Sequence, residues 1–141
     1  MKKVLLNVVG TQTADGDSDK IELTTVGTLD DDDKNYYIEY DETDDDSKTV
    51  HVNIVINKAL NTVKTERSGA YSSSLIIKKG KRNQCHYSTP YGEILMGING
   101  KNIIAEINEN NGKFIFTYTI DINGSEASKN EVNIKFRITA N

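Results

Sequence analysis

The chain of 141 residues has few side chains that could do chemistry, with one Cys, two His and no Trp. The most informative polar residue is Arg67, which alternates with Val63 and Thr65. Alternate residues of a strand share one face of its sheet, so Arg67 is expected on the same side as apolar residues. A buried, unpaired charge is costly. Arg67 therefore needs either a carboxylate partner or an anionic ligand.

One acidic residue shares an inward phase with apolar neighbours, namely Glu42, which alternates with Ile38 and Tyr40. Because a guanidinium binds carboxylate and phosphate groups well, we predict that Arg67 contacts such a group on a ligand, between amphipathic tyrosine walls. In the alternative, Arg67 lies at a strand end, pairs with Glu42 or backbone carbonyls, and only fills the interior. The predicted ligand-binding residues are Tyr40, Glu42, Arg67, Tyr87 and Tyr118.

Other chemistry is poorly supported. Cys85 and His86 are adjacent, so in a strand their side chains point to opposite faces, and His51 lies on the polar phase of its segment. These three residues are too few for a zinc site. The acidic segment 15–19 resembles the start of a calcium loop, but the required Gly and Glu positions hold other residues. We expect no catalytic residues, no metal site, no cofactor and no enzymatic activity.

The elements that position these residues are strands, because apolar residues recur at every second position along most of the chain. The segments 50–56, 114–122 and 132–138 show this most clearly. Asn-Gly pairs at 99–100, 111–112 and 123–124 predict tight hairpin turns, since both residues tolerate positive φ. We predict an all-β fold in which residues 1–141 form a single domain, an antiparallel up-and-down β-barrel of about ten strands. A two-sheet sandwich is the alternative.

Five segments occur in the order found in a known family: Thr25-Val26-Gly27, residues 37–42, Arg67-Ser68-Gly69-Ala70, Gly80 and residues 87–93. With them the chain resembles the YwiB-like family of uncharacterised bacterial proteins over essentially its whole length. The resemblance implies a calycin-type, lipocalin-like β-barrel. It implies no activity, because that family is a domain of unknown function.

The formal net charge of −4 hides an asymmetry: residues 1–50 hold 5 Lys and 14 acidic residues, and the rest hold 12 Lys or Arg and 7 acidic residues. The basic run 78–82 is interpreted as a turn with solvated lysines around Gly80. We therefore expect neither nucleic acid nor a membrane as a partner. A lone Cys85 favours a reducing compartment, and the apolar start is broken by Asn7, unlike a signal peptide. A cytoplasmic location is predicted.

The sequence thus favours a non-enzymatic barrel that binds a small amphiphilic or anionic ligand in its interior. The alternative is a structural or protein-interaction module whose barrel is filled by side chains, which small barrels allow. A cavity would favour the first interpretation, and a packed interior with an apolar outer patch the second. The outward phase of the predicted strands includes Tyr37, Val55, Leu95 and Ile104, which indicates a possible homodimer surface.

Overall fold

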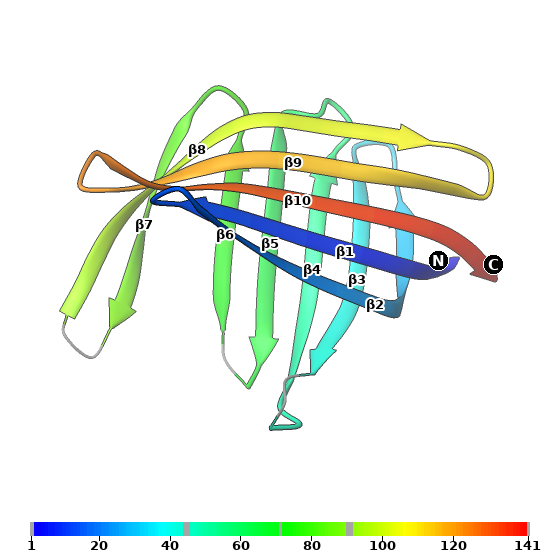
Figure 1. Ribbon diagram of the computed structural model, residues 1–141. Coiled ribbons are helices and arrows are strands. Elements are labelled where there is room, and N and C mark those ends of the chain that lie inside the picture. Colours follow the sequence, from blue (N-terminus) through cyan, green and yellow to red (C-terminus); the bar gives the residue numbers. More distant parts are fainter. Residues whose placement is uncertain (1, 44–45, 71, 90–91, 141) are drawn as a thin grey trace.

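The computed structural model describes residues 2–43, 46–70, 72–89 and 92–140, without the side chains of residues 85–89, 93 and 140. The described chain is all strand and turn (Figure 1). The strands are β1 (Lys2–Ala14), β2 (Asp17–Asp31), β3 (Asn35–Thr43), β4 (Thr49–Asn57), β5 (Thr62–Gly69), β6 (Ser73–Lys78), β7 (Arg82–Thr89), β8 (Gly92–Ile107), β9 (Asn111–Ile122) and β10 (Ser125–Ala140). The predicted number of about ten strands is confirmed.

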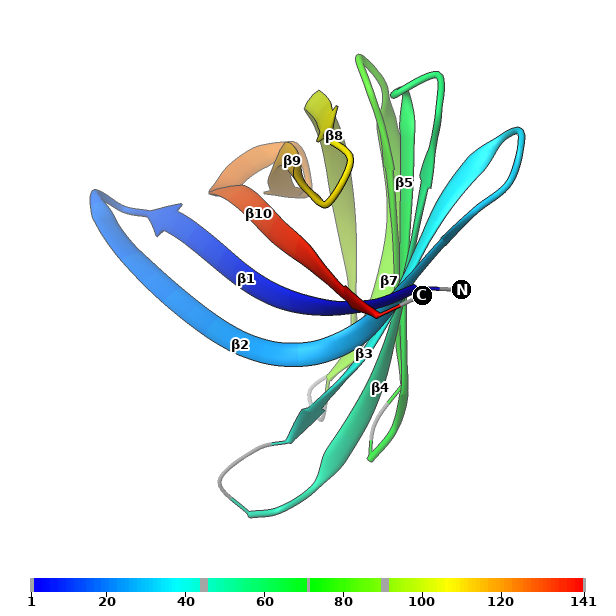
Figure 2. The ribbon, with the colours of Figure 1, turned by 90° about the vertical axis from the view of Figure 1, so that its right-hand side faces the viewer.

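All ten strands form one antiparallel sheet in the order β6-β5-β4-β3-β2-β1-β10-β9-β8-β7. Consecutive strands are neighbours, and β1 also pairs with β10, which is the up-and-down order predicted from the short connections. The sheet curls into a nearly closed barrel. In Figure 1 β2, β1, β10, β9 and β8 run across the front, and β3 to β6 cross behind them. Figure 2 shows β1 and β2 curving away from the second group.

The two ends of the sheet, β6 and β7, meet near their connecting turn. There the Gly80 N–H donates to the Gly100 carbonyl at 2.9 Å, and the Gly100 N–H donates to the Lys81 carbonyl at 3.1 Å. A Cβ on Gly100 would lie 2.2 Å from the Lys78 carbonyl oxygen. Only glycine allows this close approach, so Gly100 closes the barrel at this point.

The predicted turn at Asn99-Gly100 is therefore wrong, because both residues lie inside β8, beside an irregularity in its pairing with β9. Asn123-Gly124 is confirmed as a tight turn, with φ of 53° and 88°. The turn predicted at Asn111-Gly112 is misplaced, because both residues lie at the start of β9; the turn comes just before them and is closed by a 2.8 Å hydrogen bond from Asn108 N–H to the Asn111 carbonyl.

The core occupies the inside of the barrel and comes from the alternate residues expected there. Phe114 is fully buried, and its ring centroid lies 5.2 Å from that of Tyr36 and 5.7 Å from that of Phe136. Such aromatic contacts add to the hydrophobic effect of burial. The other fully buried large side chains are Leu6, Ile38, Ile56, Ile77, Ile98, Ile134, Val4, Val52 and Val63. The middle of the barrel is thus filled by side chains.

A second glycine opens the barrel wall. β2 pairs with β1 from Asp17 to Leu29, but its pairing with β3 runs only from Thr28 to Asp31, opposite residues 36–39. A Cβ on Gly27 would lie 2.4 Å from the Glu39 carbonyl oxygen and 2.7 Å from Leu6 Cδ1. Because Gly27 lets the strands cross this closely, β2 and β3 separate beyond it. The last part of β3, which carries Tyr40 and Glu42, has no β2 neighbour.

Candidate functional site

Arg67 lies near the end of β5, on the inner face of the barrel. Its strand neighbours of the same phase, Val63 and Thr65, are buried, whereas the Arg67 side chain is 30% exposed. Its Nη2 atom lies 3.5 Å from Glu42 Oε1 on β3. Arg67 and Glu42 therefore meet on the inner face, as their phases predicted.

The charge of Arg67 affects the pKa of two tyrosines, Tyr40 and Tyr118. Tyr40 is only 4% exposed, and its hydroxyl donates to Glu42 Oε1 at 3.4 Å. Burial, followed by the negative charge of Glu42, raises the pKa of Tyr40, and Arg67 opposes the rise. Burial also raises the pKa of Tyr118 on β9, again against the effect of Arg67. Both tyrosines stay neutral at physiological pH and can donate hydrogen bonds.

Three of the five predicted site residues, on β3 and β5, are thus joined by a hydrogen bond and an ion pair, and Tyr118 on β9 lies within range of the charge of Arg67. We call Tyr40, Glu42, Arg67 and Tyr118 the arginine cluster. Tyr87 lies in β7, but its side chain is outside the described residues. In the part of the chain that the structure describes, Glu42 is the one ion-pair partner of Arg67. A guanidinium has five N–H donors, so Arg67 retains donors for a carboxylate or phosphate group.

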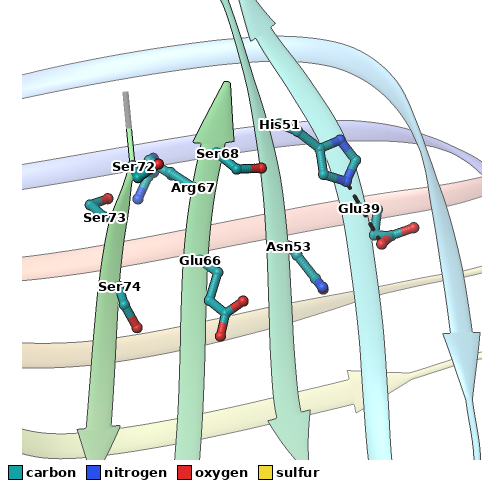
Figure 3. Close-up of a pocket in the computed structure, with 9 residues that line it drawn as sticks. All are labelled: Glu39, His51, Asn53, Glu66, Arg67, Ser68, Ser72, Ser73 and Ser74. Carbon is teal, nitrogen blue, oxygen red and sulfur yellow. Dashed lines mark ion pairs between the residues drawn. The ribbon is translucent and has the colours of Figure 1, made fainter. Parts of the chain in front are cut away.

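A hollow of about 480 Å³ lies on the outer face of β3, β4, β5 and β6 (Figure 3). Its lining is polar and comprises Glu39, His51, Asn53, Glu66, Arg67, Ser68, Ser72, Ser73 and Ser74. Arg67 therefore borders this hollow as well as the inner face. An anion entering from the strand ends can reach its guanidinium.

Across this face, Asp41, His51 and Ser68 lie directly opposite one another on β3, β4 and β5. His51 Nδ1 lies 2.8 Å from Asp41 Oδ1, and His51 Nε2 lies 3.7 Å from Glu39 Oε1 (Figure 3). The hydrogen bond to Asp41 raises the pKa of His51. His51 Nε2, the atom that would face the serine in a hydrolase triad, instead lies beside Glu39. The row resembles a hydrolase triad only in its residue types.

The sequence places His51 on the polar face of its strand but does not identify the carboxylates that contact it. Asp41 and Glu39 alternate with buried residues of β3, so their outward direction was predictable. Their contact with His51 depends on the register between β3 and β4, which alternation alone does not determine.

The structure confirms only part of the interpretation of the basic run 78–82 as a turn with solvated side chains. Gly80 has the positive φ expected of a turn, 73°. Arg82, however, binds Asp121 in a bidentate manner, with Nε to Oδ2 at 2.8 Å and Nη2 to Oδ1 at 2.7 Å. Asn99 Nδ2 adds a 2.9 Å hydrogen bond to the same carboxylate. The hydrogen bonds from Arg82 and Asn99 hold the pKa of Asp121 well below its usual range.

The Arg82 side chain reaches Asp121 across Gly97, where a Cβ would lie 2.3 Å from Arg82 Nε. Arg82 thus links β7 to β9 across β8, a structural role that no pattern in the sequence indicates.

Among the described residues, no group of three or more His, Cys, Asp or Glu side chains could hold a metal ion. The side chains of Cys85 and His86 lie outside the described residues. The described chain also contains no helix that could cross a membrane.

Comparison with known proteins gives a family and a related fold. Residues 6–134 match a family described as a domain of unknown function, DUF1934. The crystal structure of the ywiB protein from Bacillus subtilis is similar, with a TM-score of 0.80 and 20% sequence identity over 99% of this chain and 93% of that chain. No curated protein matches the chain. These findings confirm the YwiB-like family resemblance, and at this identity the structural likeness establishes the fold alone.

Proposed function

This chain belongs to the DUF1934 family, and we propose that it is a non-enzymatic protein that binds a small anionic or amphiphilic ligand through its arginine cluster. The observation that carries the proposal is the state of Arg67. It lies on the inner face of the barrel, its side chain is 30% exposed, and among the described residues it has one long ion pair, at 3.5 Å. A guanidinium with N–H donors left over can bind a carboxylate or phosphate group.

The ligand binds at the open end of the barrel rather than in its middle. Phe114 and its aromatic neighbours fill the centre, whereas the separation of β2 from β3 leaves the inner face beside Tyr40 and Glu42 without a covering strand. This placement modifies the interior site expected from sequence. It keeps the anionic group of the ligand within reach of Arg67.

An apolar surface suited to the tail of an amphiphile lies on the same inner face as Tyr118. A cross-strand row runs from Phe116 through Val132 and Gly10 to Ile21. Ile21 is 76% exposed although it shares the inward phase. The space beside Gly10 is open, with no atom within 4 Å of a built Cβ. An acyl chain lying there would cover Ile21, which supports an amphiphile over a purely polar anion.

Thermal unfolding in the presence of fatty acids and alkyl phosphates of increasing chain length tests the proposal. A ligand at 100 times its dissociation constant stabilises the native state by about 2.7 kcal/mol. We expect the melting temperature to rise for the wild type and not for Arg67→Gln. Lys64→Gln is the matched control, because Lys64 lies on the same strand but faces outward and pairs with Glu66. The absence of any shift, or an equal shift in Arg67→Gln, contradicts the proposal.

The packed interior supports a second candidate function, a structural or protein-interaction module without a small ligand. Native mass spectrometry of the protein purified from its own host separates the two candidates. A bound small molecule supports the first, and a stoichiometric protein partner alone supports the second. The single Cys supports our proposal that either function is carried out in the cytoplasm, since proteins of oxidising compartments usually pair their cysteines.

A further inference from the structure

The strands β2, β1, β10, β9 and β8 form the front layer in Figure 1, and a cross-strand row of three apolar and two polar residues lies on its outer face. Residues directly opposite one another across these five strands are Glu22, Val9, Asn133, Ile115 and Ile104. Ile104 is 44% exposed, and Val9 and Ile115 are half-buried. Leu5 and Val26, the latter 64% exposed, form a second apolar pair on the same face. Apolar side chains in register on an outer face indicate a contact surface.

Charged residues lie on both sides of this row along β10. Lys135 lies two residues beyond Asn133, and Glu131 lies two residues before it, so all three side chains point outward. Both charged residues are exposed, and neither has an ion-pair partner among the described residues. The neighbouring Lys113, in contrast, pairs with Glu106 at 3.5 Å. Along β10 the row is therefore bordered at equal distances by one cation and one anion, neither of which has an ion-pair partner among the described residues.

We propose that this face binds a second copy of the chain about a two-fold axis parallel to the row. Such an axis turns the second copy so that Lys135 of each copy faces Glu131 of the other. A two-fold axis along the strands would instead place Lys135 against its own counterpart, and like charges in contact are unfavourable. The charge pattern thus selects both the partner and the axis.

The same axis places apolar residues against apolar residues. Val9, Ile115 and Ile104 each meet their counterparts, as the self-complementary surface of a two-fold dimer requires. Asn133 also meets its own counterpart, although its Oδ1 atom is buried within the chain, where it has no hydrogen-bond partner among the described residues. Glu22 also faces itself, but it lies at the exposed rim, where water screens the repulsion.

The size of the face limits the strength of the dimer. Five strands at about 4.8 Å spacing, and about seven residues at about 3.4 Å along each strand, give a patch of roughly 24 by 24 Å. This is close to the lower limit of specific interfaces, about 600 Å² per partner. An interface of this size is typical of reversible association, so the dimer is tested over a range of protein concentrations. The arginine cluster lies on the inner face of the barrel, so the dimer is independent of the proposed ligand binding.

Of the four outward apolar residues named from the sequence, only Ile104 belongs to this face. Tyr37 and Val55 lie opposite each other on the other layer, and Leu95 lies in the half of β8 that pairs with β7. A dimer built on Tyr37 and Val55 is therefore a different interface, and the experiment below distinguishes it.

Sedimentation velocity between about 1 and 200 μM tests the proposal with charge reversals. Lys135→Glu and Glu131→Lys should each weaken the dimer at least tenfold, because each places like charges in contact twice. An equimolar mixture of the two variants should restore the dimer, since every contact across the axis is then between opposite charges. Within one chain the two positions are four residues apart on a strand, about 13 Å, so rescue by mixing reports a contact between copies.

Ile104→Glu should also give a monomer, and Ile76→Glu is its control. Ile76 is similarly exposed, at 39%, but lies on β6 at the other layer, so the dimer should persist. A monomeric wild type at 200 μM overturns the proposal. The proposal is also overturned if the mixture of Lys135→Glu and Glu131→Lys stays monomeric although each variant melts at the wild-type temperature. It is overturned as well if the dimer dissociates in Ile76→Glu but persists in Ile104→Glu. If a charge variant fails to fold, 1 M NaCl replaces it and should weaken the wild-type dimer.

Discussion

Gly100→Ala should open the barrel where its ends meet. A Cβ at position 100 would lie 2.2 Å from the Lys78 carbonyl oxygen, 2.5 Å from its carbon and 3.0 Å from the Lys79 nitrogen. All three atoms belong to the backbone, so no side-chain rotation relieves the contact. The turn must move away by about 1 Å to reach an ordinary van der Waals distance.

That movement breaks the hydrogen bonds of Gly100 with Gly80 and Lys81, at 2.9 and 3.1 Å. Each such bond contributes about 1 kcal/mol net, so we expect a loss of about 2 kcal/mol. The unfolding entropy of about 2.1 cal/mol/K per residue makes 1 kcal/mol equivalent to about 3 °C for this chain. Differential scanning calorimetry should therefore show a melting temperature about 6 °C lower. Amide hydrogen exchange at Gly80 and at position 100 should be faster.

Gly10→Ala is the matched control, because it also adds one methyl group within a strand. No atom lies within 4 Å of a Cβ built on Gly10, so this change should be neutral or stabilise the protein by up to about 1 kcal/mol through the unfolded state. The reasoning is refuted if the two variants melt within about 2 °C of each other. It is also refuted if Gly100→Ala melts lower while the amide of Gly80 stays fully protected.

Three further predictions concern the core and two carboxylate contacts. Phe114→Ala removes a fully buried ring and should cost about 3–5 kcal/mol in urea unfolding, whereas a cost below 1 kcal/mol contradicts the packed interior. Asp121→Asn should lower the melting temperature at pH 7. Because the folded-state pKa of Asp121 is lowered, its contribution is complete above its unfolded value of 3.8 and is lost as the pH falls below it, so the two melting curves should converge there. The pKa of His51 is raised, so its stabilisation is complete below about 6.5 and is lost as the pH rises through the folded value. NMR titration should give a His51 pKa above 6.5 that falls towards the ordinary value in Asp41→Asn.

Local pattern was sufficient to predict much of this structure. The period-2 alternation gave the phase of Arg67, Glu42 and Tyr118 correctly, because alternation fixes the direction of a side chain wherever one face of a strand is buried. The turn at Asn123-Gly124 was predictable for a similar reason, since its positive φ angles are a property of the two residues themselves.

The errors and omissions all involve contacts between distant segments. Asn99-Gly100 carries the same dipeptide as a true turn, yet Gly100 is required for the approach of Lys78 and not for a hairpin. Arg82 was interpreted from its basic neighbours in the sequence, but its partner, Asp121, lies two strands later in the chain. Neither contact leaves a signal within a window of ten residues.

The two close approaches at glycine have opposite consequences for function. At Gly100 the missing side chain brings the turn after β6 onto β8 and closes the sheet, so the core side chains there are sealed from water. At Gly27 the missing side chain allows the Glu39 carbonyl to lie close against β2, and β2 and β3 are no longer paired beyond this point. A sheet closed at both places would bury Arg67 without enough partners, at a high energetic cost. The opening after Gly27 gives Arg67 and Glu42 access to water, and for the same reason it gives a ligand access to them. The inward-facing arginine and the open barrel end are therefore one feature of this fold, and the position of Gly27 determines where the ligand that we propose would reach Arg67.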